Sequence, residues 1–198
     1  MPHKFPAERA ERLHDQDRRA GLDPRAVVAE LGVAPKENVL DVGAGSGFFT
    51  LVLAEAVGPE GTVIAAEVSP EMLEALRKRA SAGGWANIRY VPSEEQVVPL
   101  ADASVDRALL VDVLHEAENP RRLLQEAVRA VRRGGEVTVI EWGPGEGPPG
   151  PPAGARLSET KVRAMLAEAG LGTPLKLASV PLPHFGFRAA KPEEPAAE

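Results

Sequence analysis

Short apolar runs alternate with helical patterns along residues 38–142. Runs of about four to eight apolar residues between glycine and proline signals are typical of strands that are buried on both faces of a sheet. We therefore expect strands at Asn38–Val42, Thr62–Glu67, Ile88–Val91, Asp106–Val111 and Glu136–Trp142.

Apolar residues at helical spacing predict helices before and between these strands. Asp23-Pro24 and Ser69-Pro70 each offer a capping side chain followed by proline, which favours a helix start. The expected helices cover residues 24–32, 48–57, 69–82 and 120–132, and Gly134-Gly135 is expected to end the last of them.

The pattern changes after Trp142. Residues 143–157 are rich in glycine and proline and predict a loop, with a mobile cover over a substrate cleft as its functional alternative. An amphipathic helix is expected at Ser158–Ala169, where Ser158 provides the cap and Gly170 follows the end. Two further strands, near 174–180 and 184–190, would form a hairpin.

Repeated strand–helix units predict an α/β fold: a Rossmann-like, doubly wound sheet of about seven strands. We expect it to be mostly parallel, with an antiparallel C-terminal hairpin strand and helices on both faces. The expected single domain is residues 1–190, divided into an N-terminal helical cap (1–32), a cofactor-binding core (33–142), the loop (143–157) and a C-terminal helix and hairpin (158–190). Residues 191–198 are expected to be a flexible tail.

Composition narrows the function classes. No apolar run reaches the roughly 18 residues of a membrane-spanning helix, and the polar N-terminus shows no secretory signal, so we expect a cytoplasmic protein without membrane insertion. The net charge of -6 disfavours a nucleic-acid partner. The chain has no cysteine, and no two of its four histidines have metal-ligand spacing, so no metal site is expected.

Glycines follow the first strand at once, as Gly43, Gly45 and Gly47. In an open α/β sheet, ligands bind at the carboxyl ends of the strands, and glycine there lets the backbone approach them. A dinucleotide site of the form Gly-x-Gly-x-x-Gly would need glycine at position 48, which is phenylalanine. Glu67 ends the second strand, where a carboxylate can accept both hydroxyls of a ribose.

The run Val39-Leu40-Asp41-Val42-Gly43-Ala44-Gly45-Ser46-Gly47 closely resembles motif I of class I S-adenosylmethionine-dependent methyltransferases. The resemblance extends in register from Val33 to Trp142, and more loosely to residue 190. Within the family, the chain is similar to the small-molecule group that includes the ubiquinone and menaquinone biosynthesis methyltransferases. It implies S-adenosyl-L-methionine as the cofactor, with its methionine carboxylate at the glycine turn. The cofactor-binding residues that it implies are Asp41, Gly43, Ala44, Gly45, Gly47, Glu67, Val68, Ser93, Glu94, Val111 and Asp112.

Two details of this set stay open. An acidic residue of the family reaches the adenine amino group just after the third strand, and Ser93, Glu94 and Glu95 are all candidates here. Val68 would pack against the adenine, and either Val111 or Asp112 would line the methionine end.

The carboxyl end of the fourth strand is where we expect the chemistry. His115 and Glu116 lie there and are the candidate catalytic residues, with a packing role for the histidine as the alternative. Glu141-Trp142 would line the acceptor pocket, and His14 would belong to a lid. Without cysteine, arsenite methylation and attack on a pyrimidine through a thiolate are disfavoured.

The partner expected from these features is a small organic methyl acceptor, methylated at oxygen, nitrogen or carbon. The absence of an Asn-Pro-Pro-Tyr-like motif disfavours methylation of nucleobase amines. Two other readings remain: a non-catalytic S-adenosylmethionine-binding protein or partner subunit, and a nicotinamide-dependent oxidoreductase, against which Phe48 argues. The protein is expected to be a monomer or a homodimer.

Overall fold

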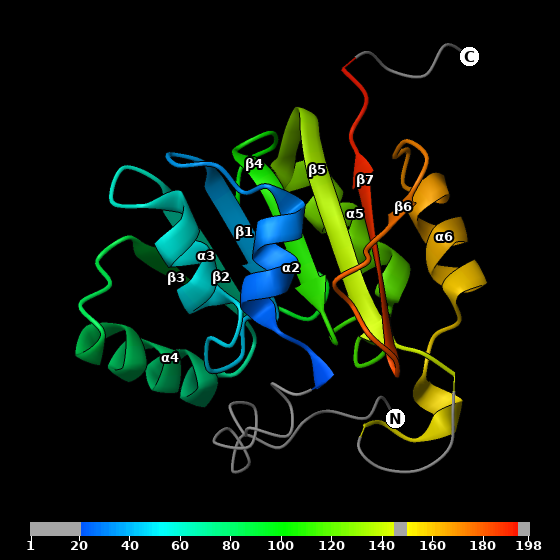
Figure 1. The fold of residues 1–198 in the computed structure, drawn as a ribbon, viewed down its shortest axis with the longest axis horizontal. Coiled ribbons are helices and arrows are strands. Elements are labelled where there is room, and N and C mark those ends of the chain that lie inside the picture. Colours follow the sequence, from blue (N-terminus) through cyan, green and yellow to red (C-terminus); the bar gives the residue numbers. More distant parts are fainter. Residues whose placement is uncertain (1–20, 145–149, 194–198) are drawn as a thin grey trace.

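Seven strands form one sheet in the computed structural model, which describes residues 21–144 and 150–193 (Figure 1). The strands are β1 (Asn38–Val42), β2 (Thr62–Glu67), β3 (Ile88–Pro92), β4 (Val105–Val111), β5 (Val131–Trp142), β6 (Leu175–Lys176) and β7 (His184–Ala190). The helices are α2 (Pro24–Leu31), α3 (Thr50–Val57), α4 (Pro70–Ala82), α5 (Pro120–Ala130) and α6 (Glu159–Glu168), with a short 3-10 helix η2 (Ala153–Ala155).

The strand order is β3-β2-β1-β4-β5-β7-β6. The first five strands are parallel, whereas β7 runs antiparallel to both β5 and β6. The predicted Rossmann-like sheet, mostly parallel with an antiparallel C-terminal hairpin, is therefore confirmed. The order reverses between β1 and β4, which places the ligand crevice of such a sheet at the carboxyl ends of these two strands.

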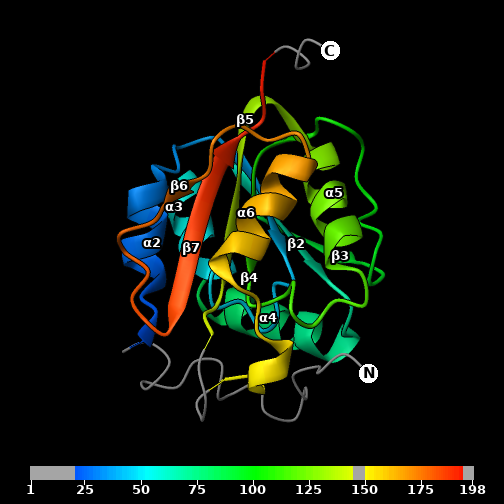
Figure 2. The ribbon, with the colours of Figure 1, turned by 90° about the vertical axis from the view of Figure 1, so that its right-hand side faces the viewer.

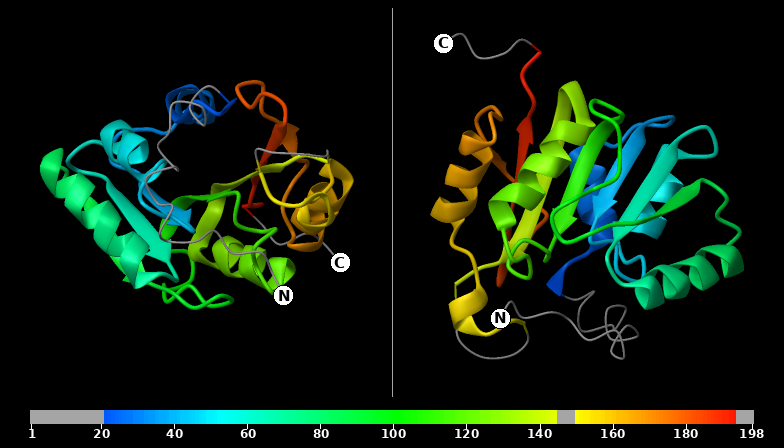
Figure 3. Two further views of the ribbon diagram at one scale, coloured as in Figure 1. Left: turned by 90° about the horizontal axis from the view of Figure 1, so that it is seen from below. Right: turned by 180° about the vertical axis from the view of Figure 1, so that it is seen from behind.

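Helices cover both faces of the sheet, as the continuous apolar strands require. Helices α2, α3 and α4 pack on one face around Leu53 and Leu76, and α5 and α6 pack on the other around Leu124 and Met165. Figure 2 looks onto the β6–β7 edge, with α2 and α5 on opposite sides of the sheet. Figure 3 includes a view from below, toward the carboxyl ends of the parallel strands.

Local capping explains where the helices begin. Asp23, Ser69, Asn119 and Ser158 each accept a hydrogen bond from a backbone N–H of the first turn that follows. Proline occupies the next position in three of them, where its missing N–H removes no helical hydrogen bond. Among the described helices, none has the length and apolar character that crossing a membrane requires.

Several element boundaries differ from those expected. Helix α5 ends at Ala130 rather than near residue 132, because Val131 already pairs with Val105 as the first residue of β5. Gly134 and Gly135 therefore shape the irregular start of β5 instead of ending the helix; a Cβ on Gly135 would lie 2.3 Å from the carbonyl oxygen of Asp106. Helix α3 begins at Thr50, since residues 45–49 form turns, and β6 has only two residues.

Some expected segments fall wholly or partly outside the described residues. These are cap residues 1–20 with His14, loop residues 145–149 and tail residues 194–198. The start of the expected tail is described: Lys191 Nζ donates to the carbonyls of Val128 and Val131 at 2.8 and 2.7 Å, which satisfies acceptors at the end of α5.

Candidate active site

The glycine turn joins β1 to α3 at the reversal of strand order. Gly43, Gly45 and Gly47 all have positive φ, of 70°, 53° and 95°. A Cβ on Gly43 would lie 2.7 Å from Val113 Cγ2, and one on Gly47 would lie 2.3 Å from Leu76 Cδ1. Only glycine combines this backbone with such close packing, so the turn has the form predicted for a ligand-binding loop.

Glu67 links the ends of β1 and β2. Its Oε2 accepts a hydrogen bond from Gly45 N at 2.9 Å, and its Oε1 accepts from Val68 N and Ser69 N, each at 2.9 Å. The side chain is 8% exposed. Three backbone donors thus fix a buried carboxylate beside the glycine turn, where it can accept further hydrogen bonds from hydroxyl groups.

Asp41 lies beneath the turn and is 3% exposed. Thr50 Oγ1 donates to its Oδ2 at 2.6 Å, which ties the first residue of α3 to β1. Burial raises the pKa of Asp41 to about 7; the Thr50 hydrogen bond opposes this rise, and the nearby Glu67 adds to it. The structure therefore places this predicted residue under the site, as a support for the loop.

The segment after β3 lies next to Glu67, at the carboxyl end of β2. Ser93 N donates to the carbonyl of Glu67 at 3.0 Å, and Glu94 forms a β-bridge with Val97, while Val68 is 45% exposed. These residues lie near Glu67, and the contact of Ser93, Glu94 or Glu95 with adenine stays a prediction.

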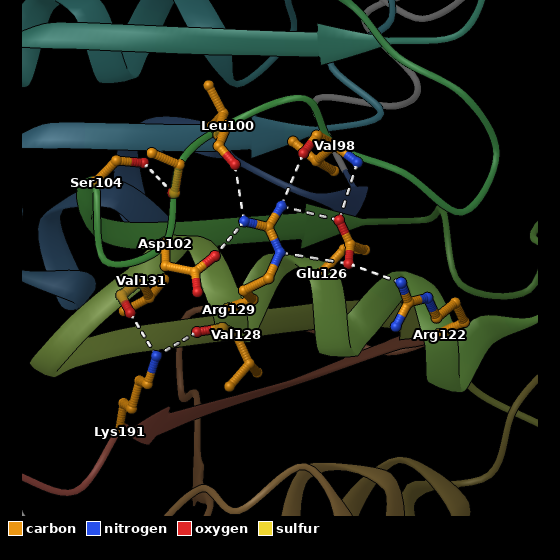
Figure 4. Close-up of polar contacts among 11 residues, drawn as sticks. Val98, Leu100, Asp102, Ser104, Arg122, Glu126, Val128, Arg129, Val131 and Lys191 are labelled. Carbon is orange, nitrogen blue, oxygen red and sulfur yellow. Dashed lines mark hydrogen bonds and ion pairs between the residues drawn. The ribbon is translucent and has the colours of Figure 1, made fainter.

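A network on α5 anchors this segment (Figure 4). Arg129 donates to the carbonyls of Val98 and Leu100 at 2.9 and 2.7 Å and forms an ion pair with Glu126. Glu126 is 4% exposed and also accepts from Val98 N at 3.4 Å. The connection between β3 and β4 is therefore attached to the helix by charged side chains rather than by apolar packing alone.

His115 and Glu141 form a buried pair at the ends of β4 and β5. His115 Nδ1 lies 2.7 Å from Glu141 Oε2, and the two side chains are 3% and 0% exposed. Glu141 Oε1 also accepts from Leu114 N and His115 N, at 2.7 and 3.3 Å. Glu116 approaches the other ring nitrogen of His115 at 3.8 Å.

The electrostatics of this pair follow from its burial. Burial lowers the pKa of the His115 imidazole, but the hydrogen bond and charge of Glu141 outweigh it, so the pKa lies above its usual value. Burial raises the pKa of Glu141, and the hydrogen bond with His115 offsets only part of the rise. Through its hydrogen bonds to Leu114 N and His115 N, Glu141 holds the segment after β4 in place.

A second imidazole–carboxylate pair lies beside the first. His184 Nε2 is 3.3 Å from Asp112 Oδ2, and the two side chains are 3% and 9% exposed. His184 stands opposite Trp142 in the β5–β7 register, with ring centroids 4.0 Å apart. Our sequence analysis missed His184, because no motif marks it and 72 residues separate it from Asp112.

The predicted site residues thus gather along one edge of the sheet. The glycine turn and Glu67 lie at β1 and β2, Ser93 and Glu94 follow β3, and Val111, Asp112, His115 and Glu116 end or follow β4. A surface pocket of about 470 Å³ includes His184 and Leu182 in its lining. A second, of about 270 Å³, lies between α2 and α3 and away from this edge.

Comparisons with known proteins agree with this geometry. A family model described as a methyltransferase domain matches residues 40–139. The chain is similar to a structurally solved S-adenosylmethionine-dependent methyltransferase from Aquifex aeolicus, with 31% identity and a TM-score of 0.85, over 95% of this chain and 100% of that one.

Two curated proteins are similar over a part of their length. The arsenite methyltransferase of Halobacterium salinarum is 33% identical over 60% of this chain and 30% of its own. The ubiquinone/menaquinone biosynthesis C-methyltransferase UbiE of Legionella pneumophila is 35% identical over 56% of this chain and 44% of its own. The chain therefore spans less than half of either relative.

Proposed function

Because this chain belongs to the S-adenosylmethionine-dependent methyltransferase family and shares its cofactor, we propose that the protein transfers a methyl group to a small organic acceptor. The observation that carries the proposal is the link between Gly45 N and the buried carboxylate of Glu67. This hydrogen bond joins the glycine turn, which a ligand can approach closely, to a carboxylate that can accept hydrogen bonds from hydroxyl groups. The two lie at the ends of neighbouring strands.

The residues present fit S-adenosylmethionine. Glycine at 43 and 47 permits the tight turn, because a Cβ would collide with Val113 or Leu76 there, and three N–H donors hold the carboxylate of Glu67 in place. We assign the turn, Gly43 to Gly47, to the methionine end, Glu67 to the ribose hydroxyls, and Val68 with Ser93 or Glu94 to the adenine. Asp41 acts on the turn from below, through Thr50.

When bound, the cofactor supplies a methyl group that its positive sulfur has already activated. The protein then has to align the acceptor, and positioning of this kind contributes up to about 7–11 kcal/mol to catalysis. Val111 and Asp112 end the strand that borders the glycine turn and are the residues we assign to the methyl end. His115 and Glu116, in the next turn of chain, belong to the acceptor side.

Two observations support a small organic acceptor. The net charge of -6 is the wrong sign for gripping a nucleic-acid backbone. The chain carries no cysteine, so it offers no thiolate for arsenic, although one relative is an arsenite methyltransferase.

Calorimetry tests the cofactor site. The protein is titrated with S-adenosylmethionine, S-adenosylhomocysteine and NAD, and binding of the two sulfur compounds alone is expected. Glu67→Gln should weaken their binding by roughly 1.5–3 kcal/mol, the range for hydrogen bonds to a charged group. Glu74→Gln, which changes an exposed glutamate on α4, is the matched control and should bind as the wild type does.

Tight binding of NAD without a response to either sulfur compound would contradict the proposal. Methyl transfer itself is followed with radiolabelled cofactor and a panel of phenols, amines and carbon acids. Cofactor binding without transfer to any compound of the panel would favour a non-catalytic binding protein.

A further inference from the structure

Four ionisable side chains are buried together at the ends of β4 and β5 and the start of β7. They form two pairs, His115 with Glu141 and His184 with Asp112, and each side chain is at most 9% exposed. The charge of Asp112 also acts on His115 and on Glu141, so the pairs form one electrostatic cluster. The four side chains are not arranged as ligands of one metal ion.

The two imidazoles differ in which nitrogen is engaged. His115 directs Nδ1 to Glu141 and has Glu116 near its Nε2. His184 directs Nε2 to Asp112, and within residues 21–144 and 150–193 nothing hydrogen-bonds to its Nδ1. A buried polar nitrogen without a partner costs roughly 1–3 kcal/mol, so its retention points to a ligand that pairs with it.

The carboxylate determines the form of this ring. An ionised carboxylate only accepts hydrogen bonds, so an imidazole that donates to it through Nε2 and carries no second hydrogen presents a lone pair at Nδ1. The ring has little freedom to turn, because Trp142 packs against it and its Nε2 is paired with Asp112. Asp112 itself has a left-handed backbone, with φ of 55°, of the kind that clusters at functional sites.

We propose that Nδ1 of His184 binds and deprotonates the methyl acceptor, and that the acceptor is therefore a hydroxyl or amine compound. The proposal rests on the proposed methyltransferase function and narrows its substrate class. His184 also belongs to the lining of the surface pocket of about 470 Å³.

The proposed step balances in atoms and charge. The lone pair of the acceptor oxygen or nitrogen forms the new bond to the methyl carbon, and the methyl–sulfur bond breaks with its electron pair on sulfur. The proton of the acceptor passes to Nδ1 of His184, which becomes an imidazolium paired with Asp112. His115 cannot take this part through Nδ1, since Glu141 already occupies that atom.

Nitrogen NMR of the ¹⁵N-labelled protein tests the geometry without knowledge of the natural acceptor. In complex with S-adenosylhomocysteine, at slightly alkaline pH, the His184 ring should carry hydrogen on Nε2 and none on Nδ1. His184→Gln assigns the signal. Phenol should shift the Nδ1 resonance, whereas anisole, which lacks the hydroxyl hydrogen, should not.

A ring protonated on Nδ1, or an equal response to phenol and anisole, would overturn the proposal. The kinetic arm compares wild type with His184→Gln, whose amide can still reach Asp112. Methyl transfer to an oxygen or nitrogen acceptor should slow by roughly 10²–10⁴-fold, the usual effect of a general base, with unchanged cofactor affinity. Equal rates in the two proteins would reject His184 as the base. Absence of cofactor binding to the wild type would instead reject the proposed function.

His184→Ala adds a readout that a structural role would not give. Removal of the ring leaves a space beside Trp142, and free imidazole should restore part of the transfer rate of this variant. The wild type should not respond to imidazole in this way. Failure of imidazole to restore a slowed variant that still binds cofactor would argue that the ring only supports the site.

Discussion

At the scale of single residues, the carboxyl group of Asp41, which lies beneath the glycine turn, makes the stability of the fold depend on pH. The carboxyl group is fully buried, and burial raises its pKa from 3.8 to about 7. The group is therefore protonated in the folded protein over a pH range in which it is ionised in the unfolded chain. Such a group stabilises the fold below pH 4, and this contribution is lost as the pH rises toward 7.

We therefore predict that Asp41→Asn changes the pH dependence of stability. In wild type, the rise in the pKa of Asp41 corresponds to a loss of unfolding free energy on the order of 4 kcal/mol as the pH rises through this range. Asparagine keeps an acceptor for Thr50 and does not ionise, so the variant should gain stability over wild type as the pH rises from 4 to 8. Urea unfolding at several pH values measures the difference, and a constant difference would show that Asp41 does not titrate in this range.

At the scale of elements, the segment between β3 and β4 depends on α5. Arg129 reaches across to two carbonyls of that segment and to Asp102, and Glu126 holds the N–H of Val98 (Figure 4). This segment follows Ser93 and Glu94, which we assign to the adenine end. We therefore expect loosening of this segment to weaken cofactor binding, although α5 does not contact the glycine turn in the network described.

Arg129→Met should loosen the segment and lower stability by roughly 1–3 kcal/mol, since it leaves the carboxylate of Glu126 poorly paired. Hydrogen exchange should speed up at the amide of Val98, and cofactor affinity should fall. Arg122→Met is the matched control: its guanidinium also contacts Glu126, at 3.2 Å, but is 51% exposed, so the change should stay below about 1 kcal/mol. Similar effects of the two variants would contradict the anchoring role.

The elements were largely predictable because their signals are local. Capping residues followed by proline fixed the starts of α2 and α4, and continuous apolar runs gave β1 and β2 to the residue. The end of α5 was not predictable in this way. Val131 leaves the helix because Val105, on another strand, pairs with it, and such a contact leaves no mark within either segment.

At the scale of the whole molecule, topology decides which parts of the site a sequence reveals. The glycine turn and Glu67 belong to one continuous β1–α3–β2 unit, so their spacing alone predicts a shared ligand. His184 and Asp112 come from β7 and the end of β4, and only the antiparallel insertion of β7 beside β5 brings them together. The contact between Gly45 and Glu67 was therefore predictable, whereas the buried pair of His184 and Asp112 needed the structure.

The glycine turn follows β1, at the point where the strand order of the sheet reverses. A ligand held there binds only the folded protein, so S-adenosylhomocysteine should raise the unfolding temperature. At a concentration 100 times its dissociation constant, the stabilisation should be about 2.7 kcal/mol, or roughly 5–11 °C for a chain of this size.

Thermal unfolding over a series of S-adenosylhomocysteine concentrations measures this effect. The increase should continue with the logarithm of concentration, and Glu67→Gln should need more ligand for the same increase because its site is weaker. His184→Gln should follow the wild-type curve, since we place His184 on the acceptor side. A loss of the increase in His184→Gln would show that the two sides of the site are one binding unit, and no increase in the wild type would contradict the site at the glycine turn.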